Sequence, residues 1–484
     1  MQQQLTISLS PSQAVSDDII KEYICNHLAL SANAISGFNI LKRSIDARSK
    51  QAAILLSLNV FINEPFHQRE IDKIFLPDVT HSKKIVIVAG AGPAGLFAAL
   101  KLIGSGIKPI ILERGKDIRS RRRDLAILNK DGIINPESNY CFGEGGAGTY
   151  SDGKLYTRSK KRGDVNRILN ILVQFGASEN ILYDAHPHIG TNKLPQIITS
   201  IREQITACGG EFFFGKKITD LIIKNNTLTG VHTSGHAIFE ADALILATGH
   251  SARDIFTLLY QKNILIEAKP FAIGVRVEHP QQLIDSIQYH HSQRNEFLPP
   301  ASYSLVQQVD GRGVFSFCMC PGGIIAPAST APGELVVNGW SPSKRNNPFA
   351  NSGIVVAVED NNLQHLQQQH GPLAAMAFQH AVEERAYQAG GGNFVAPAQR
   401  LVDFTERKFS SSLPDCSYLP GTNSALMHEV LPPFVYQSLQ KAFKEFGKKM
   451  KGYFTNEALV VATESRTSSP VRIPRDPVTL EHPQ

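Results

Sequence analysis

The sequence predicts an α/β fold with a parallel sheet, and two segments carry this prediction. In residues 84–96 an apolar run that reads as a strand stops in the pattern G-x-G-x-x-G, and helix-forming residues follow at once. A second apolar run, Ile107 to Leu112, ends in Glu113. A strand, a glycine turn, a helix and a second strand that ends in an acid are typical of a Rossmann-type unit that binds a dinucleotide. The alternative is a structural turn, because the glycine pattern alone also arises by chance.

The candidate cofactor contacts lie in that turn and at the end of the second strand: Gly90, Ala91, Gly92, Pro93, Ala94, Gly95, Glu113 and Arg114. Gly90 permits the sharp turn, Gly92 has no side chain to block a phosphate, and Gly95 lets the helix pack against the strand. The helix dipole attracts the pyrophosphate. Glu113 lies 23 residues after Gly90, where the motif places an acid that binds a ribose hydroxyl.

Residues 241–249 indicate which dinucleotide is bound. They read as a buried strand that ends in Ala247, Thr248 and Gly249, whose small side chains allow the backbone to approach a cofactor. Flavoproteins of the glutathione-reductase type return to their nucleotide domain through such a strand, and this resemblance implies FAD as the cofactor. NAD(P)H is a candidate electron donor. An ordinary core strand followed by a turn is the alternative.

The composition is that of a soluble enzyme, with 484 residues, 42% of them hydrophobic, and a formal net charge of +6. The N-terminus is polar, and no apolar run reaches the roughly 18 residues of a membrane span. We therefore expect a cytoplasmic protein with a small-molecule substrate and no membrane partner. The mild positive charge does not by itself favour nucleic acid. The six cysteines form neither a disulfide framework nor a C-x-x-C zinc pair.

The chain divides into four predicted parts. They are a small N-terminal α+β module (1–80), an FAD/NAD(P)-binding Rossmann-type domain (81–254), an inserted α+β substrate or cap domain (255–440) and a return to the FAD domain (441–484). Alternating and helical hydrophobic patterns predict a β-α-β-β order in the first part. Such a module either packs on the rest of the protein or binds RNA or another partner.

A glycine-rich loop, residues 139–155, is expected to face the cofactor or substrate. Glycine admits backbone conformations that other residues resist, so the segment suits close approach to a ligand. Glu144, Asp152 and Lys154 are its titratable groups and the candidates for proton transfer or anion contact. The alternative is a solvent loop whose charges only keep it soluble.

Cys318 and Cys320 lie on a predicted strand that ends in a Pro-Gly-Gly turn. Residues two apart in an extended strand point to the same face, so the two thiols are expected side by side. A thiol pair beside a flavin could exchange electrons with it. Equally, cysteine is a small hydrophobic residue that packs well in sheets.

Two polar patterns are weaker signals. The basic run at Arg119 and Arg121–Arg123 reads as a solvated helix face, with a phosphate or polyanion contact as the alternative. Asp184, His186 and His188 invite a metal interpretation, but a third nearby ligand beside the two histidines is lacking, so no metal site is predicted.

Several longer motifs resemble one family: residues 113–116, 139–155, 185–193, 247–254, 318–323 and 464–470. Together they look like the largely uncharacterised NAD(FAD)-utilising dehydrogenases of bacteria and plastids. The resemblance implies an FAD domain of glutathione-reductase type, interrupted by a substrate domain and preceded by a small α+β module. It implies no particular substrate.

We therefore expect an FAD-dependent oxidoreductase that transfers hydride between flavin and an organic substrate or a reduced nicotinamide. A flavin monooxygenase and a non-catalytic nucleotide- or RNA-associated protein are the alternatives. Members of the family continue beyond the segment 464–470 into one more strand, a glycine-rich turn and a helix, whereas this sequence ends at Gln484. From this we expect FAD to bind weakly or only through its adenosine half.

Overall fold

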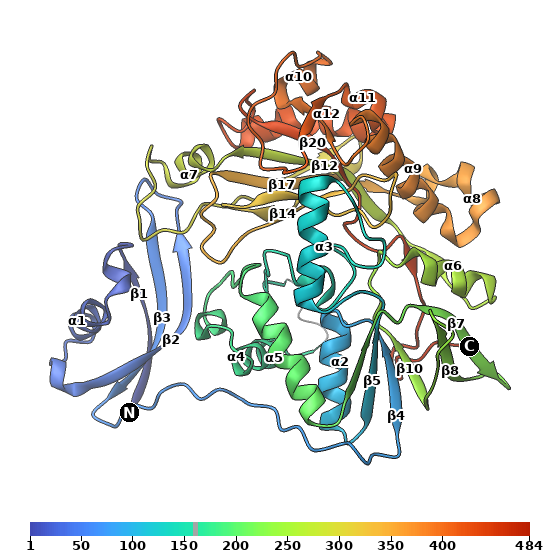
Figure 1. The fold of residues 1–484 in the computed structure, drawn as a ribbon. Coiled ribbons are helices and arrows are strands. Elements are labelled where there is room, and N and C mark those ends of the chain that lie inside the picture. Colours follow the sequence, from blue (N-terminus) through green and yellow to red (C-terminus); the bar gives the residue numbers. More distant parts are fainter. Residues whose placement is uncertain (158–162) are drawn as a thin grey trace.

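The computed structural model describes residues 1–157 and 163–484. Its chain forms three regions (Figure 1): a small sheet at the N-terminus, a parallel sheet flanked by helices, and a large mixed sheet covered by helices. Helix α3 (Ile118–Asp131) stands between the parallel sheet and the large sheet. None of the helices in the described ranges is long and apolar enough to cross a membrane.

The N-terminal module has the predicted β-α-β-β order. It contains β1 (Gln2–Leu9), α1 (Asp17–Leu28), β2 (Ile35–Asp46) and β3 (Ala53–Ile62), and the antiparallel sheet has the order β1-β3-β2. Every second residue of β3 is buried over most of its length, as expected for a strand with one face on a core. Ser16 accepts a hydrogen bond from the Ile19 amide and so caps α1, whose Ile20 and Ile24 are buried.

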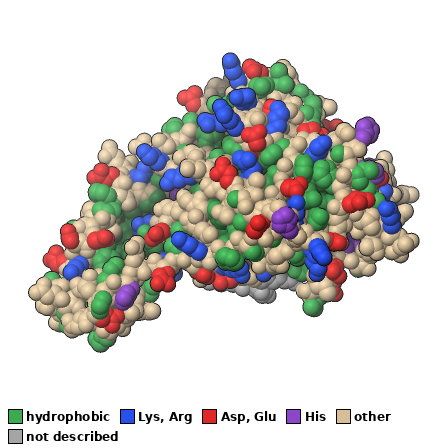
Figure 2. All heavy atoms as spheres, turned by 60° about the horizontal axis from the view of Figure 1, so that its bottom comes forward, with side chains coloured by type: hydrophobic (Ala, Val, Ile, Leu, Met, Phe, Trp, Pro, Cys, Tyr) green, Lys and Arg blue, Asp and Glu red, His purple; other side chains and the backbone are tan. Residues whose placement is uncertain are grey.

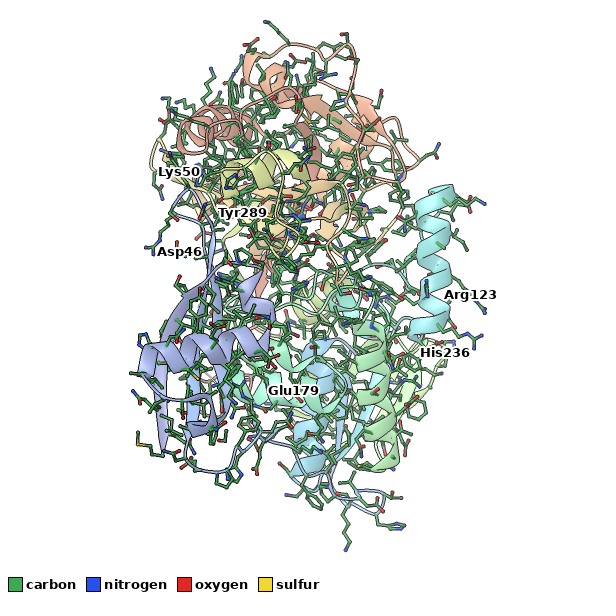
Figure 3. The ribbon with its side chains drawn as sticks, turned by 90° about the vertical axis from the view of Figure 1, so that its left-hand side faces the viewer. Asp46, Lys50, Arg123, Glu179, His236 and Tyr289 are labelled. Atoms are coloured by element: carbon green, nitrogen blue, oxygen red, sulfur yellow. The ribbon has the colours of Figure 1, made fainter. Side chains whose placement is uncertain are left out.

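The module docks on both other regions. Arg43 of β2 donates to the two carboxylate oxygens of Asp184 at 2.7 and 3.0 Å, and its amide donates to the Tyr183 carbonyl. The β2–β3 turn, marked by Asp46 and Lys50 in Figure 3, lies beside Tyr289 of α7 (Gln281–Tyr289). One continuous apolar core joins the module to the large sheet. In Figure 2 the module projects at the left, and charges of both signs are interspersed on the face drawn.

The nucleotide sheet confirms the Rossmann-type prediction. It consists of β4 (Ile85–Ala89), β5 (Lys108–Glu113), β6 (Glu211–Phe214) and β10 (Ala243–Leu246), all parallel, in the order β10-β4-β5-β6. Parallel strands place their carboxyl ends at one edge, so the glycine turn after β4 and Ala247 after β10 lie together. The strand β10 is only half-buried, not buried as predicted, because it forms an edge of the sheet.

Helices and a small second sheet complete this region. The helices are α2 (Pro93–Gly104), α3, α4 (Val165–Gln174), α5 (Leu194–Ala207) and α6 (Arg253–Gln261). The second sheet is antiparallel, with β7 (Ile218–Lys224), β8 (Thr227–Thr233) and β9 (Ile238–Glu240). It follows β6 in the chain and leads back into β10, so the parallel sheet is interrupted between its third and fourth strands.

The large sheet has seven strands in the order β13-β14-β17-β12-β20-β18-β19. Its strands are β12 (Phe271–Pro280), β13 (Val306–Val309), β14 (Arg312–Cys320), β17 (Phe349–Val358), β18 (Ala396–Arg400), β19 (Thr422–Ser424) and β20 (Leu459–Glu464). A two-stranded sheet, β15 (Ile324–Pro327) and β16 (Val337–Trp340), packs beside it. The remaining helices of this region are α7, α8 (Gln364–His370), α9 (Ala374–Ala389), α10 (Leu401–Glu406), α11 (Met427–Val430) and α12 (Pro433–Lys449).

The structure moves one predicted boundary. Residues from 441 onward were expected to return to the FAD domain, but β20 lies inside the large sheet between β12 and β18, and all six of its residues are buried. The chain reaches the nucleotide region only afterwards. There β21 (Val471–Arg472) pairs with β11 (Glu267–Ala268), and Val471 packs in the same core cluster as Ile87 of β4. The apolar pattern of β20 suits either sheet, so the sequence alone does not choose between them.

Candidate cofactor-binding site

A cavity of about 470 Å³ opens at the carboxyl edge of the nucleotide sheet. Most of the predicted cofactor contacts line it: Gly90, Gly92, Pro93, Ala94, Glu113, Arg114, Ala247, Thr248 and Gly249. Ala91 and Gly95, the other two, lie behind the wall, where both are buried. The predicted cofactor contacts and the cavity therefore coincide.

The three glycines of the turn have different physical roles. Gly90 has φ +104°, and a Cβ there would lie 2.6 Å from the Ala247 carbonyl oxygen. A Cβ on Gly95 would lie 1.9 Å from the Gly90 carbonyl oxygen. Gly92 is different, because a Cβ on it would meet only the Gly146 Cα, at 3.8 Å. Gly90 and Gly95 are thus required by the fold, whereas Gly92 leaves open space in front of the helix.

That space suits an anion. Gly92 is the N-cap of α2 and Pro93 is its first residue. The first turn of a helix has amide groups without intrahelical partners, and the positive end of the helix dipole lies there. The residues present therefore fit the pyrophosphate of a dinucleotide.

Glu113 holds the walls of the cavity together. One carboxylate oxygen accepts hydrogen bonds from the amides of Gly115 and Gly143, at 2.8 and 3.0 Å, and the other accepts one from Ala91 at 2.8 Å. The side chain is 5% exposed and borders the cavity. Because the second oxygen has only one bond, it keeps acceptor capacity for a ribose hydroxyl.

Arg114 borders the same space, but its charge is already balanced. Its guanidinium donates to Glu137 at 2.6 Å and to Asp254 at 2.9 Å, and it lies 4.0 Å from the centre of the Phe142 ring. The geometry makes Arg114 a rigid wall of the site rather than a free cation. A cofactor in the cavity would contact the edge of the Arg114 guanidinium, whose charge is already paired.

The opposite wall comes from the glycine-rich loop, of which Gly146, Ala147 and Gly148 line the cavity. Residues 143–148 repeat the spacing G-x-G-x-x-G, but they form an irregular loop with a short 3-10 helix and follow no strand. The loop is held by Arg121, which is 0% exposed and donates to the carbonyls of Asn139 and Glu144. Arg119, Arg122 and Arg123 are exposed, as a solvated helix face requires.

Glu144 does not face the cavity as expected. It is 0% exposed, and its carboxylate accepts hydrogen bonds from the Ile118 amide at 2.9 Å and from Arg202 at 2.7 Å. Burial raises the pKa of Glu144. The loop turns this side chain inward to anchor the start of α3, which a pattern of residue types does not reveal.

His250 is a cavity residue that the sequence analysis missed. It follows Gly249 directly and borders the cavity, and its Nδ1 atom has no hydrogen-bond partner among the described residues. Burial, followed by the positive charges of Arg466, Lys269 and Arg253, lowers its pKa to about 4. The imidazole is therefore neutral at pH 7 and offers a hydrogen bond to a bound molecule. In the sequence, the feature that indicates this role is the position of His250 directly after Ala247, Thr248 and Gly249.

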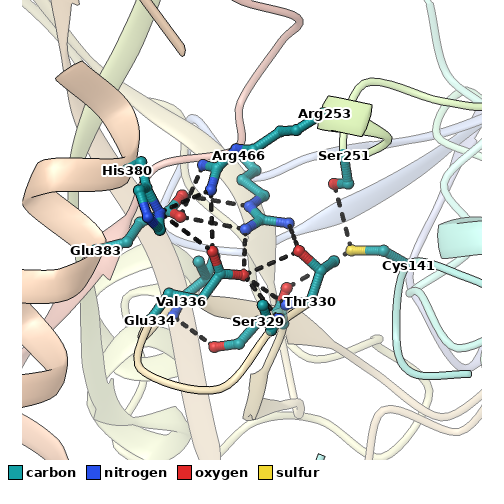
Figure 4. Close-up of polar contacts among 12 residues, drawn as sticks. Cys141, Ser251, Arg253, Ser329, Thr330, Glu334, Val336, His380, Glu383 and Arg466 are labelled. Atoms are coloured by element: carbon teal, nitrogen blue, oxygen red, sulfur yellow. Dashed lines mark hydrogen bonds and ion pairs between the residues drawn. The ribbon is translucent and has the colours of Figure 1, made fainter. Parts of the chain in front are cut away.

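A buried ion network stands next to His250 and joins α6 to the large sheet (Figure 4). Arg253 donates to Glu334 at 2.9 Å and to Glu383 at 2.7 Å. Arg466 donates to the same two carboxylates, at 2.6 and 3.1 Å.

His380 approaches Glu334 as well, at 3.5 Å, so the two acids and the imidazole could hold a metal ion by distance alone. The two guanidinium groups already balance both carboxylates, so the donor set does not fit a cation.

The remaining catalytic candidates form a second cluster outside the cavity lining. Lys154 lies 3.4 Å from Asp152, 3.8 Å from the Cys318 sulfur and 3.5 Å from the Cys320 sulfur. The strand is not extended here as predicted, because Cys318 has φ +47° and a bulge lies between Phe317 and Cys320. The two thiols nevertheless contact the same ammonium group. The structure thus brings together four residues that the sequence placed in two separate motifs.

The histidines of the 184–188 segment have other partners. Asp184 pairs with Arg43, the His186 ring packs 4.7 Å from that of Tyr156, and His188 Nε2 lies 3.2 Å from the Ser343 carbonyl oxygen. The three side chains therefore serve contacts between segments.

Comparison with known proteins gives the family. A family model described as "FAD-dependent protein, C-terminal domain-like" matches residues 270–467, and a domain of unknown function matches residues 1–61. An uncharacterized protein of Clostridium beijerinckii is 39% identical over 483 residues, which cover 96% of this chain and 90% of that protein.

Two solved structures are distantly similar. A GidA-related protein from Thermus thermophilus is 12% identical, with a TM-score of 0.25, covering 40% of this chain and 73% of that one. The protein CtdE, in complex with FAD and its substrate, is 13% identical, with a TM-score of 0.26, covering 56% of this chain and 57% of that one. The Rossmann-type assignment therefore depends on the strand order and glycine turn of this chain. At 39% identity over nearly its whole length, the chain belongs to the family of the clostridial protein.

Proposed function

We propose that this protein is an FAD-dependent oxidoreductase, a dehydrogenase or reductase, that binds the adenosine diphosphate part of FAD in the cavity at the carboxyl edge of the nucleotide sheet. The observation that carries the proposal is the open space in front of Gly92, at the start of α2, with Glu113 on the neighbouring wall. When bound, FAD supplies two-electron chemistry that protein side chains lack.

The chain's own residues would bind and orient that cofactor. The first turn of α2 receives the pyrophosphate, and Glu113 accepts a hydrogen bond from a ribose hydroxyl. Neutral His250 offers its Nδ1 atom to a group inside the cavity. The loop residues 146–148 close the cavity from the opposite side.

The test begins with the absorbance spectrum of the purified full chain and identification of any nucleotide that it releases. The protein freed of nucleotide is then titrated with FAD and, separately, with ADP. We expect both to bind, with FAD displaced by ADP, because the adenosine diphosphate part fills the cavity. Failure of both nucleotides to bind would overturn the proposal.

A second measurement separates the reaction classes. The FAD-loaded protein is mixed with NADH or NADPH, first without oxygen and then with it. Flavin reduction without stoichiometric oxygen consumption supports a dehydrogenase or reductase with a nicotinamide donor. Oxygen consumption coupled to oxygen insertion into an organic substrate would favour a monooxygenase instead.

A further inference from the structure

The cluster around Lys154 joins three distant segments at one point of the large sheet. Lys154 and Asp152 come from the glycine-rich loop, Cys318 and Cys320 from the end of β14, and Arg345 from the loop between β16 and β17. Arg345 donates to Asp152 at 2.7 Å. The cavity wall contains none of these residues, so the cluster is distinct from the cavity.

A second layer lies beneath the thiols. Arg276 of β12 is 0% exposed and donates to Glu464 at 2.9 Å and to the Cys318 carbonyl oxygen at 3.0 Å. The Cys320 sulfur lies 4.0 Å from the same guanidinium. A Cβ on Gly339 would lie 1.9 Å from the Arg276 Nη1 atom, so a glycine there makes room for the buried cation.

The cluster has more cations than carboxylates that are ion-paired with them. Three cations, Lys154, Arg276 and Arg345, are paired with two carboxylates, Asp152 and Glu464. Burial raises the pKa of Glu464 to about 7, which weakens its negative charge further. Uncompensated buried charge is costly. One negative charge on the thiol pair would neutralise the remaining cation.

The two thiols are not equivalent. Cys318 is half-buried, whereas Cys320 is 0% exposed. The Cys320 Sγ atom donates to the Cys318 carbonyl oxygen at 3.3 Å. The neighbouring Cys320 side chain and the positive charges of Lys154 and Arg276 lower the pKa of Cys318 well below its ordinary value, although burial opposes this. The Lys154 side chain is 34% exposed, so a positive group stands at the entrance to the pair. The arrangement has an accessible nucleophile and a protected second thiol.

The spacing of the two cysteines also allows a disulfide between them. Two residues of extended strand span roughly 6.4–6.8 Å. A disulfide requires Cα atoms about 4.4–6.8 Å apart. The spacing of residues two apart in a strand therefore lies at the upper end of the range that a disulfide allows.

We propose that Cys318 and Cys320 form a dithiol site that exchanges two electrons with a small anionic disulfide. The Cys318 thiolate attacks one sulfur of the disulfide, forms a mixed disulfide and releases the first thiolate. Cys320 then loses its proton and attacks the Cys318 sulfur, which closes the Cys318–Cys320 disulfide and releases the second thiolate. The protein dithiol is oxidised by two electrons, and the small disulfide is reduced to two thiols.

This exchange goes beyond the proposed flavin chemistry and needs no flavin. Its test is therefore independent of whether FAD binds. The full chain is reduced, desalted and treated with oxidised glutathione near pH 7, and the modified cysteines are identified by peptide mass spectrometry over time. Cys25, also half-buried, is the internal reference.

We expect wild type to form the Cys318–Cys320 disulfide and Cys320→Ser to accumulate glutathione on Cys318. Modification of Cys318 should be at least about 10-fold faster than that of Cys25, because the lowered pKa of Cys318 raises its thiolate fraction near pH 7. Lys154→Met should slow it about 10-fold, and Lys154→Arg should restore most of the rate. Cys318 reacting no faster than Cys25, or equal rates in Lys154→Met and wild type, would overturn the proposal.

Discussion

The sites at the nucleotide sheet and at the large sheet are formed by different chemical groups. Around the cavity the critical contacts are backbone groups, three glycines and one carboxylate, and a short stretch of chain from β4 to β5 supplies most of them. In the large sheet the polar groups are buried ion pairs between distant segments, such as Arg276 and Glu464, which lie 188 residues apart. The first region leaves space for a ligand, whereas the second fills its interior with charged side chains that contact one another.

The two regions should therefore be sensitive to different kinds of substitution. Where backbone groups border an empty space, a larger side chain fills that space and prevents ligand binding, while the fold around it is unchanged. A network of buried charges is damaged by removing atoms, because each lost partner leaves another charge unpaired in a medium that solvates it poorly. Substitutions of the two kinds therefore test the comparison directly.

The largest effect is expected from Gly92→Asp. A carboxylate there would occupy the space in front of α2 and repel a pyrophosphate, while the fold has room for the side chain. We expect FAD affinity to fall at least about 1,000-fold, roughly 4 kcal/mol, measured by calorimetric titration. Gly104→Asp, at the exposed far end of the same helix, is the matched control and should bind normally. Unchanged FAD binding by a folded Gly92→Asp protein would show that the cofactor lies elsewhere.

The next effect concerns the ion network. Arg466→Met removes a guanidinium that serves Glu334, Glu383 and Thr330 and leaves the two acids with Arg253 alone. Breaking a buried pair costs about 3–5 kcal/mol, so the free energy of unfolding should fall by that amount in denaturant titrations. Lys441→Ala breaks an exposed pair with Asp310, whose side chains are 57% and 74% exposed, and should cost at most about 1 kcal/mol. Equal effects would contradict the contrast between buried and exposed pairs.

The free energy of unfolding should also depend on pH, because of a buried carboxyl group in the large sheet. Burial raises the pKa of Glu278 from 4.5 to about 7 in the folded protein, although bonds from Ser417 oppose this. Between these pH values the folded state holds the proton more tightly than the unfolded state, so stability falls as pH rises through the window. The change is about 3 kcal/mol at most.

Glu278→Gln should remove that part of the slope in unfolding curves recorded from about pH 5 to pH 8. The part due to Glu464, whose pKa is also raised to about 7, should persist in the variant. A variant with the slope of wild type would show that Glu278 is ionised in the fold throughout this range.

The smallest effect is expected where the N-terminal module docks. Arg43→Ala removes the paired hydrogen bonds to Asp184, whose side chain is 19% exposed, and should lower the unfolding free energy by about 1 kcal/mol. Arg48→Ala breaks a local pair with Asp46 in which the arginine is 88% exposed, and its effect should be within error. Identical thermal unfolding of the two variants would mean that the Arg43 contact adds nothing to docking.

The sequence determined the nucleotide half of the protein because the relevant physics is local there. The glycine spacing, the apolar strands and the acid at the end of β5 all lie within 30 residues, and nine of the eleven predicted cofactor contacts line the cavity. The β-α-β-β module could also be read from its periodicity, since alternation of buried residues follows from the geometry of a single strand.

The assembly of the large sheet and the pairing of its charges depend on contacts between distant segments, which the sequence pattern does not reveal. An apolar strand such as β20 fits any buried sheet position, so its neighbours depend on the packing of the whole chain. The inward turn of Glu144, the neutral state of His250 and the contact of Lys154 with Cys318 likewise arise from residues far apart in sequence. Burial and charge pairing are properties of three-dimensional surroundings, and residue types alone do not specify them.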